Sequence, residues 1–338
     1  MRHVEPLWAS DMLKVEQPLR RKIVKCKQFY IHKCLFGNPF LGKPNFLLTK
    51  YFLMLNLPYY FSTKKKFNSL MYEEPIFHIA GDSSLIIECG DDGSLYLNLQ
   101  ILAFERMIRQ AIIPGLIDTA ALRTTIMIYY DPFVILAPQL IDRLKALLSK
   151  KMPLPGRISS RVISLPVWFN DRWTRECAES HGVTPNLEII ADENNMSLET
   201  VIETIVQPTW FVSYTSFQFG FFGALPMDPA RVLKSSKWKA PRKSTPPGTV
   251  GLVGGQVVHY SLAGPGGAMM LGVTPVKTFD TEGRNAFFKE SPLLVHPGDR
   301  VRFISIGSDR YEDIKNHIDD YDYQIEEGFI EPRNYENV

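Results

Sequence analysis

The sequence has few of the residue patterns that indicate a metal, redox or nucleotide site. Its four cysteines stand at no metal-ligand or redox spacing, which argues against a zinc module and a disulfide scaffold. It has no GxxxxGK[ST], HExxH or GxSxG motif and no GxGxxG after an expected strand, so a nucleotide hydrolase acting alone and a zinc protease are disfavoured. We therefore expect no metal on this chain and a reducing, cytoplasmic setting.

A long apolar run is lacking as well. Residues 45–62 are the most apolar stretch, but Lys50, Asn56 and Pro58 interrupt it. The stretch is therefore too short for a membrane span, and it lies too far from the start for a secretory signal. We expect no membrane partner.

Charge divides the chain into two unequal parts. Residues 1–70 carry 13 Lys/Arg against 3 Asp/Glu, although the net charge of the whole chain is only +2. A basic arm can attract nucleic acid, but nothing in the acidic remainder indicates a nucleic-acid reader, so we predict no such partner. The arm follows neither a helical nor a strand period, and we expect a basic, poorly ordered extension. One interpretation is that it lies upstream of a protein that begins at Met71.

Residues 71–151 carry the pattern of a small α/β domain. Two short strands are expected within 76–88 and another within 124–130. A helix is expected where Ile101, Phe104 and Ile108 recur at helical spacing, and Pro138 is placed to start a second one. A Pro/Gly-rich linker follows at 152–156.

Residues 157–307 change in character along their length. A strand at 162–169 and a short helix capped by Ser197 come first. Short β-prone runs then alternate with Pro/Gly turns about every ten residues, which predicts a barrel or sandwich. Residues 308–338 are acidic and read as a solvated helix or tail. The fold class is therefore α+β.

A few polar residues and glycines in the β-rich region offer chemistry. Lys243 lies in a loop framed by prolines, where a cation can meet a carboxylate or phosphate, unless it is an ordinary surface lysine. His259 and Tyr260 end a strand before a glycine turn, so either can face a pocket or pack. Glycines allow a backbone to approach a ligand closely, or else form turns; the candidates are Gly248, Gly251, Gly254, Gly266 and Gly267.

Ordered motifs from about residue 75 to 306 resemble the KipI-like family. This family includes allophanate hydrolase subunit 1, the 5-oxoprolinase subunit designated B and the carboxyltransferase portion of urea carboxylase. The motifs that carry the resemblance are Pro246–Gly254, Gly264–Gly267, Leu271–Pro275, Phe279-Asp280 and Pro297–Phe303.

The resemblance implies a small α/β domain followed by a cyclophilin-like β-barrel. It also implies an ATP-linked amide hydrolase or a biotin-dependent carboxyltransferase, with an active site shared with a homologous second subunit. The expected cofactors are biotin on a partner, such as a separate biotin carrier, or ATP bound by the complex, and the expected substrate is a small amide or urea-like molecule. In this interpretation Lys243, His259 and Tyr260 are the catalytic candidates, and the glycines wall the pocket.

Three positions depart from the family pattern. Ile205 stands where many members have a histidine, Val273 replaces the arginine of a GRTP motif, and Ala268 replaces an aromatic residue. The segment 209–212 with Asp228-Pro229 is nearer to the urea carboxylase pattern. The departures favour an alternative, a non-catalytic module that inhibits a sensor histidine kinase, and a peptide-binding barrel is a third hypothesis.

Overall fold

The computed structural model describes residues 71–336 except 92, 150–153 and 155. The expected basic extension at 1–70 lies outside the described residues. In the rest, a small α/β unit precedes a larger β-rich unit, so the predicted α+β fold class is confirmed. The predicted domain boundaries remain predictions.

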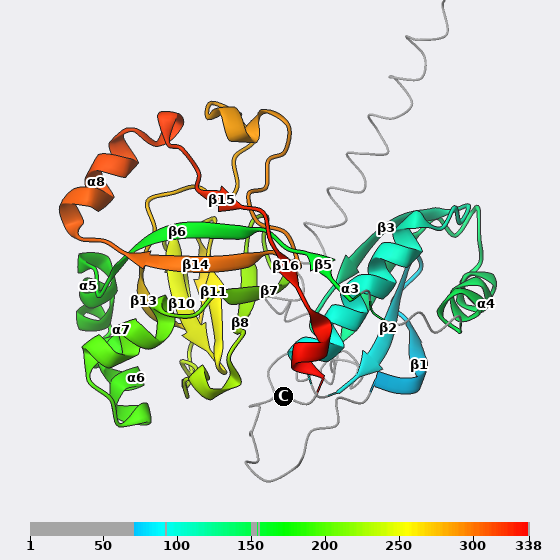
Figure 1. Cartoon of the computed structure of the whole chain (residues 1–338), viewed down its shortest axis with the longest axis horizontal. Helices are drawn as coiled ribbons and strands as arrows, with labels where there is room; N and C mark the ends of the chain where they lie inside the picture. The colour runs from blue at the N-terminus through cyan, green and yellow to red at the C-terminus, as the bar shows by residue number, and fades with distance from the viewer. Residues whose placement is uncertain (1–70, 92, 150–153, 155, 337–338) are drawn as a thin grey trace, which may run out of the picture. The chain divides into compact units, whose positions relative to one another are not determined.

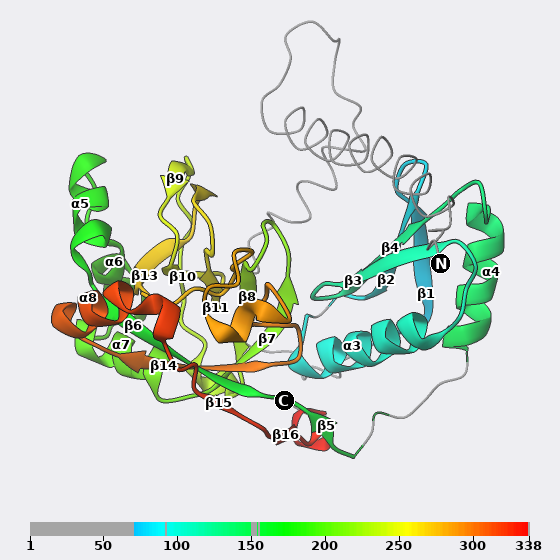
Figure 2. The same ribbon diagram turned by 90° about the horizontal axis from the view of Figure 1, so that it is seen from above.

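The small unit is a four-stranded antiparallel sheet with two helices (Figure 2). In β2 and β4 every second residue is buried, as a sheet with one covered face requires. Helix α3 is capped by Ser94, whose side chain accepts from the Leu97 N–H at 3.1 Å. Helix α4 has Pro138 in its first turn, as predicted. The elements are β1 (Met71–Ile79), β2 (Ser84–Gly90), α3 (Leu95–Gln110), β3 (Leu116–Ala121), β4 (Thr125–Tyr130) and α4 (Ala137–Leu148).

The larger unit is a closed barrel of seven strands in the order β13-β10-β11-β8-β7-β14-β6, which the pairing of β13 with β6 closes. Neighbouring strands are antiparallel except β14 and β6, which run parallel over six residue pairs. The barrel strands are β6 (Val162–Phe169), β7 (Trp210–Thr215), β8 (Phe222–Pro226), β10 (Thr249–Val253), β11 (Gln256–His259), β13 (Met269–Val273) and β14 (Arg300–Ser305).

Apolar side chains fill the inside of the barrel, and among the largest that are fully buried are Trp210, Phe222 and Phe303. Figure 1 shows α5 (Arg172–Ser180), α6 (Asn186–Asn194) and α7 (Leu198–Val206) grouped beside the barrel. Helix α7 is capped by Ser197, as predicted.

Two short strands, β9 (Arg242–Thr245) and β12 (Gly264–Gly266), pair with each other in a ribbon separate from the barrel sheet. Gly266 lies opposite Arg242 in this ribbon, and Gly264 lies opposite Thr245. The ribbon matters for function because both of its strands come from the segments in which the sequence placed candidate residues.

The C-terminal segment, expected to be a solvated helix or tail, contains a helix and also short strands. It begins with a helix, α8 (Ser308–Asn316), but its next strands pair with earlier ones. Strand β15 (Ile325–Glu326) pairs with β6, and β16 (Phe329–Ile330) pairs with β5 (Ile158–Ser159). Strands of two residues leave no readable alternation in a sequence, so composition could not indicate these pairings.

Candidate active site

The predicted cation, Lys243, is exposed on β9, and its neighbour Arg242 is the buried one. Only 3% of the Arg242 surface is exposed. Successive residues of a strand point to opposite faces, so the two basic side chains serve different surroundings. Sequence reasoning chose Lys243 and missed Arg242, because the strand period says that the two differ but does not say which one is inside.

Arg242 lies among an aromatic ring, a main-chain carbonyl and glycine backbone. Its Nη2 donates to the Ala268 carbonyl at 2.8 Å, and its Cζ lies 5.0 Å from the centroid of the Trp238 ring, within cation–π range. Burial lowers the pKa of Arg242, while the nearby Cys177 and Tyr260 act in the opposite direction. Among the described residues, no carboxylate forms an ion pair with this guanidinium.

Tyr260 lies beside this guanidinium at the end of β11. Its ring packs edge-on against Phe221, with centroids 5.2 Å apart, and against Phe217 at 6.2 Å. Burial raises the pKa of the Tyr260 hydroxyl, and Arg242 and the Ala268 backbone partly offset this effect. At neutral pH the hydroxyl is therefore a hydrogen-bond donor.

The main chain at Gly266 packs against the Tyr260 hydroxyl. A Cβ at this position would lie 2.7 Å from the Tyr260 hydroxyl oxygen and would also collide with the Thr245 hydroxyl. Thr245 is fully buried. The next residue, Gly267, approaches the Lys237 side chain, with its Cβ position 3.1 Å from Cε. This close approach of backbone to hydroxyl groups needs glycine.

His259 lies on the other side of the strand from Tyr260. It is fully buried and its Nε2 is 2.8 Å from the Thr278 hydroxyl. Its ring is 5.2 Å from that of Phe222, inside the barrel. Burial lowers the pKa of His259 to about 4, so the imidazole is neutral at pH 7. The structure thus separates two residues that the sequence offered for one pocket, because adjacent strand residues alternate in direction.

The other three candidate glycines lie away from Tyr260's hydroxyl and have local conformational roles. Gly248 has φ +84°, and a Cβ there would meet the Thr274 carbonyl. Gly254 has φ +56° in the hairpin turn between β10 and β11. Gly251 lies within β10, where a Cβ would be 3.0 Å from the Met269 carbonyl oxygen. Of the five glycines, Gly266 is the one whose Cβ position lies against the Thr245 and Tyr260 hydroxyls.

An aromatic loop borders Tyr260. Phe217 adopts φ +65°, a conformation that costs energy for a residue with a Cβ, and 57% of its surface is exposed. Gly264 leaves room for the Phe217 ring edge and for Gln218, since its Cβ position would lie 3.0 Å from the Gln218 Oε1. Residues in sparsely populated backbone conformations cluster at active sites and ligand clamps.

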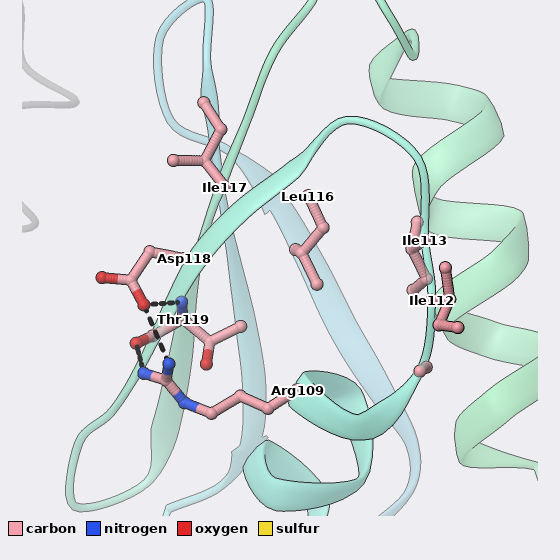
Figure 3. A pocket seen from close by; sticks show the side chains of 8 residues that line it. Arg109, Ile112, Ile113, Leu116, Ile117, Asp118 and Thr119 are labelled. Carbon is pink, nitrogen blue, oxygen red and sulfur yellow. Dashed lines mark hydrogen bonds and ion pairs between the residues drawn. The ribbon is translucent and has the colours of Figure 1, made fainter.

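A separate cavity of about 340 Å³ lies on the small unit, between the end of α3 and β3. Figure 3 shows Ile112 and Ile113 on one side of it, and Arg109 and Asp118 facing each other on the other side. Arg109 already pairs with Asp118 at 3.0 Å and with Glu105. This cavity therefore lacks the unpartnered donor that distinguishes the Arg242 region.

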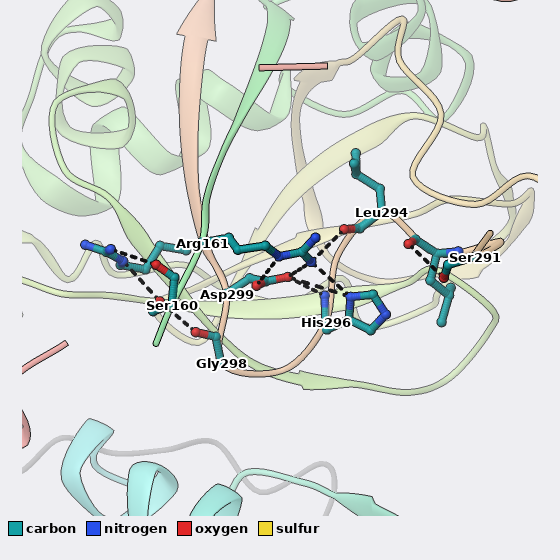
Figure 4. Close-up of polar contacts among 9 residues, drawn as sticks. Ser160, Arg161, Ser291, Leu294, His296, Gly298 and Asp299 are labelled. Carbon is teal, nitrogen blue, oxygen red and sulfur yellow. Dashed lines mark hydrogen bonds and ion pairs between the residues drawn. The ribbon is translucent and has the colours of Figure 1, made fainter. Parts of the chain in front are cut away.

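Another arginine cluster fixes the start of β14 against β6 (Figure 4). Arg161 donates through Nε to the Asp299 Oδ1 at 3.0 Å and through Nη2 to the Leu294 carbonyl at 3.1 Å. Asp299 also accepts from the His296 N–H at 2.8 Å. The Asp299 hydrogen bond raises the pKa of Arg161 despite its burial. Every group here has a partner, which indicates a structural role.

Comparison with known proteins places this fold. Residues 75–288 match the family described as the carboxyltransferase domain, subdomain C and D. The chain belongs to this carboxyltransferase domain family. The resemblance read from the ordered motifs is thereby confirmed.

Named relatives come from two kinds of protein. The chain is 27% identical to the 5-oxoprolinase subunit designated B of Bacillus subtilis (strain 168), over 70% of this chain and 94% of that one. It is 26% identical to the urea amidolyase of Lachancea kluyveri, over 76% of this chain but only 15% of that protein. The crystal structure of the K. lactis urea amidolyase superposes with a TM-score of 0.68 at 21% identity, covering 79% of this chain and 17% of that chain, which shows the shared fold.

Two features are absent from the described residues. No group of three or more His, Cys, Asp or Glu side chains in them is arranged to hold a metal ion. Within the same residues, no helix has the length and apolarity needed to cross a bilayer.

Proposed function

We propose that this chain is a subunit of an ATP-linked amide hydrolase or biotin-dependent carboxyltransferase complex, with an active site shared with a homologous second subunit. Two facts support a subunit. The chain matches nearly the whole length of a protein named as a subunit, and it matches a small part of a much longer amidolyase. The first relative is named as a subunit of a complex, and in the second the matching part is a small segment of a longer protein.

The observation that carries the proposal is the buried polar cluster of Tyr260, Arg242 and Gly266 of β12. Amide hydrolysis and carboxyl transfer both develop negative charge on an oxygen, and preorganised donors stabilise it. The Tyr260 hydroxyl and the Arg242 N–H groups are such donors. Lys243, exposed one residue further along β9, is proposed as a cation that this chain presents to the face where the second subunit would dock.

A complete reaction also needs a proton acceptor. His259 is sealed in the barrel and hydrogen-bonded to Thr278, so we assign it a positioning role, in which it fixes the strand end that holds Tyr260. The acceptor would then come from the second subunit. We therefore expect the subunit to be inactive when it is alone.

We propose that the site takes the carboxyl group of carboxylated biotin rather than a nucleotide. The hydroxyls of Thr245 and Tyr260 lie beside the Gly266 backbone, and a carboxylate oxygen is an acceptor for hydroxyl and guanidinium donors. Carboxylated biotin, delivered on a carrier, would supply the carboxyl group. ATP would be bound elsewhere in the complex, and a small amide or urea-like molecule would be the substrate.

The test is reconstitution with the homologous second subunit. We expect a stable complex and turnover of a lactam or of urea with ATP. Lys243→Ala should abolish this turnover without a change in melting temperature, whereas Lys239→Ala, an exposed lysine nearby, should leave it intact. Retained turnover in Lys243→Ala would reject the role of Lys243, and absence of a complex would reject the proposed function.

A regulatory module is the second candidate. Ala268 and Val273, two of the departures from the family pattern, are both buried in the β-rich unit, at 3% and 5% exposure, and Ala268 is the residue whose carbonyl holds Arg242. A change at Ala268, which contacts Arg242, favours altered or lost activity. Co-purification distinguishes the candidates, because a sensor histidine kinase without a second subunit indicates regulation.

A further inference from the structure

Arg242 is a buried charge with most of its donors unused. Its Nε and Nη1 have no hydrogen-bond partner, so three N–H groups are left without an acceptor. Burying an ionised group without a counter-charge is costly, and proteins usually pair such groups. An arginine that stays unpaired is a candidate for pairing with a ligand.

A second buried polar atom nearby is also without a partner. The Thr245 hydroxyl oxygen is fully buried and makes no hydrogen bond. It lies against Gly266, the residue that pairs with Arg242 across the ribbon, and the Tyr260 hydroxyl lies against the same glycine. The unused donors of Arg242, the Thr245 hydroxyl and the Tyr260 hydroxyl therefore surround one short piece of backbone.

We propose that Arg242 binds the carboxylate or carbamate group of a small planar ligand, with the hydroxyls of Thr245 and Tyr260 as further hydrogen-bond partners. A guanidinium carries donors only and keeps its charge, so its preferred partner is an anionic oxygen. The aromatic rings of Phe217, Phe221 and Tyr260 beside the site favour a flat group over a tetrahedral phosphate. This inference deepens the proposed function by giving the charge of the ligand. The binding step stands by itself, and only the reaction that follows it rests on the proposed function.

The full chain alone can test the inference, using acetate and acetamide as probes. The two have the same size and shape and differ in charge. Because Trp238 lies under the guanidinium, we expect acetate to change tryptophan emission in a saturable way, at constant pH and ionic strength, and acetamide to have no effect. The change should disappear in Trp238→Phe. An equal response to both probes, or a response to phosphate and not to acetate, would overturn the proposal.

Variants assign the effect to Arg242. Arg242→Met should weaken acetate binding about tenfold or more, since a charged hydrogen bond is lost, and Thr245→Val should weaken it less. Arg161→Met, which removes a paired arginine, should leave the acetate response of the folded protein unchanged. Unchanged acetate affinity in Arg242→Met would refute the assignment, and the acetate and acetamide comparison on the unmodified chain decides the matter even if that variant does not fold. Loss of turnover in the reconstituted pair with acetate binding intact would count against the proposed function alone.

Discussion

Two arginines in the β-rich unit show opposite solutions for a guanidinium taken out of water. Arg161 bonds Asp299, a main-chain carbonyl and the His296 ring, and its pKa is raised. Arg242 is more deeply buried, bonds one carbonyl and has a lowered pKa. The first arrangement is what stability favours, and the second needs another reason to persist.

The difference teaches how to separate a structural cation from a functional one. Removing either partner of a buried ion pair is costly. The pair of Arg161 and Asp299 therefore helps to hold β6 and β14 in register. A buried cation with unused donors destabilises the empty protein and is retained where a ligand completes it. The comparison predicts that substitutions in the two clusters change stability in opposite directions.

The largest effect should follow from breaking the Arg161 cluster. Asp299→Ala leaves Arg161 without its carboxylate and removes the acceptor of the His296 N–H. We expect the free energy of unfolding to fall by about 3 kcal/mol, the cost of leaving one member of a largely buried ion pair. Urea unfolding at pH 7 measures it. A loss below about 1 kcal/mol would mean that this pair behaves like a surface salt bridge.

His259 differs from both arginines, because a buried histidine can avoid burying a charge by staying neutral at pH 7. Its folded pKa, about 4, lies below the unfolded value of about 6.5, so the unfolded chain binds the proton first as pH falls. Its contribution to stability is present above pH 6.5 and is lost between about 6.5 and 4, by roughly 3 kcal/mol in all. His259→Gln keeps a side chain able to bond Thr278. We expect its free energy of unfolding to change less with pH in this window than that of the unmodified protein.

Parallel pH curves for the His259→Gln variant and the unmodified protein would contradict this. Carboxylates titrate in the same range, but they are common to both proteins and cancel in the difference.

Much of the fold was predictable because local signals agreed with the packing. Pro138 and Ser197 mark helix starts, and the apolar run 162–169 is a buried barrel strand with the predicted bounds. Strand β3 was missed because its segment LIDTAA exposes two consecutive residues and shows no clear alternation. Helix α5 was missed although Asp171 caps it and accepts from two backbone N–H groups, a signal present in the sequence.

The candidate site was only partly predictable. The segment that holds Lys243 and the turn that holds Gly266 were found from their prolines and glycines, and the structure brings these two segments together as β9 and β12. Which side chain of each pair enters the site depends on strand direction. Tyr260 faces the site while His259 faces the core, and Arg242 is buried while Lys243 is exposed. A period of two separates neighbours but does not orient them.

The smallest expected change in the free energy of unfolding is that of Arg242→Met, and its sign separates a functional from a structural role. Arg242→Met removes an unpaired buried charge and keeps apolar contact with Trp238, so we expect the free energy of unfolding without ligand to stay level or rise by about 1 kcal/mol. The gain is limited because the Ala268 carbonyl loses its donor. Urea unfolding beside Arg161→Met, which should lose stability, provides the matched measurement. If both substitutions destabilise equally, Arg242 is a structural residue like Arg161, and the contrast between the two arginines has no functional meaning.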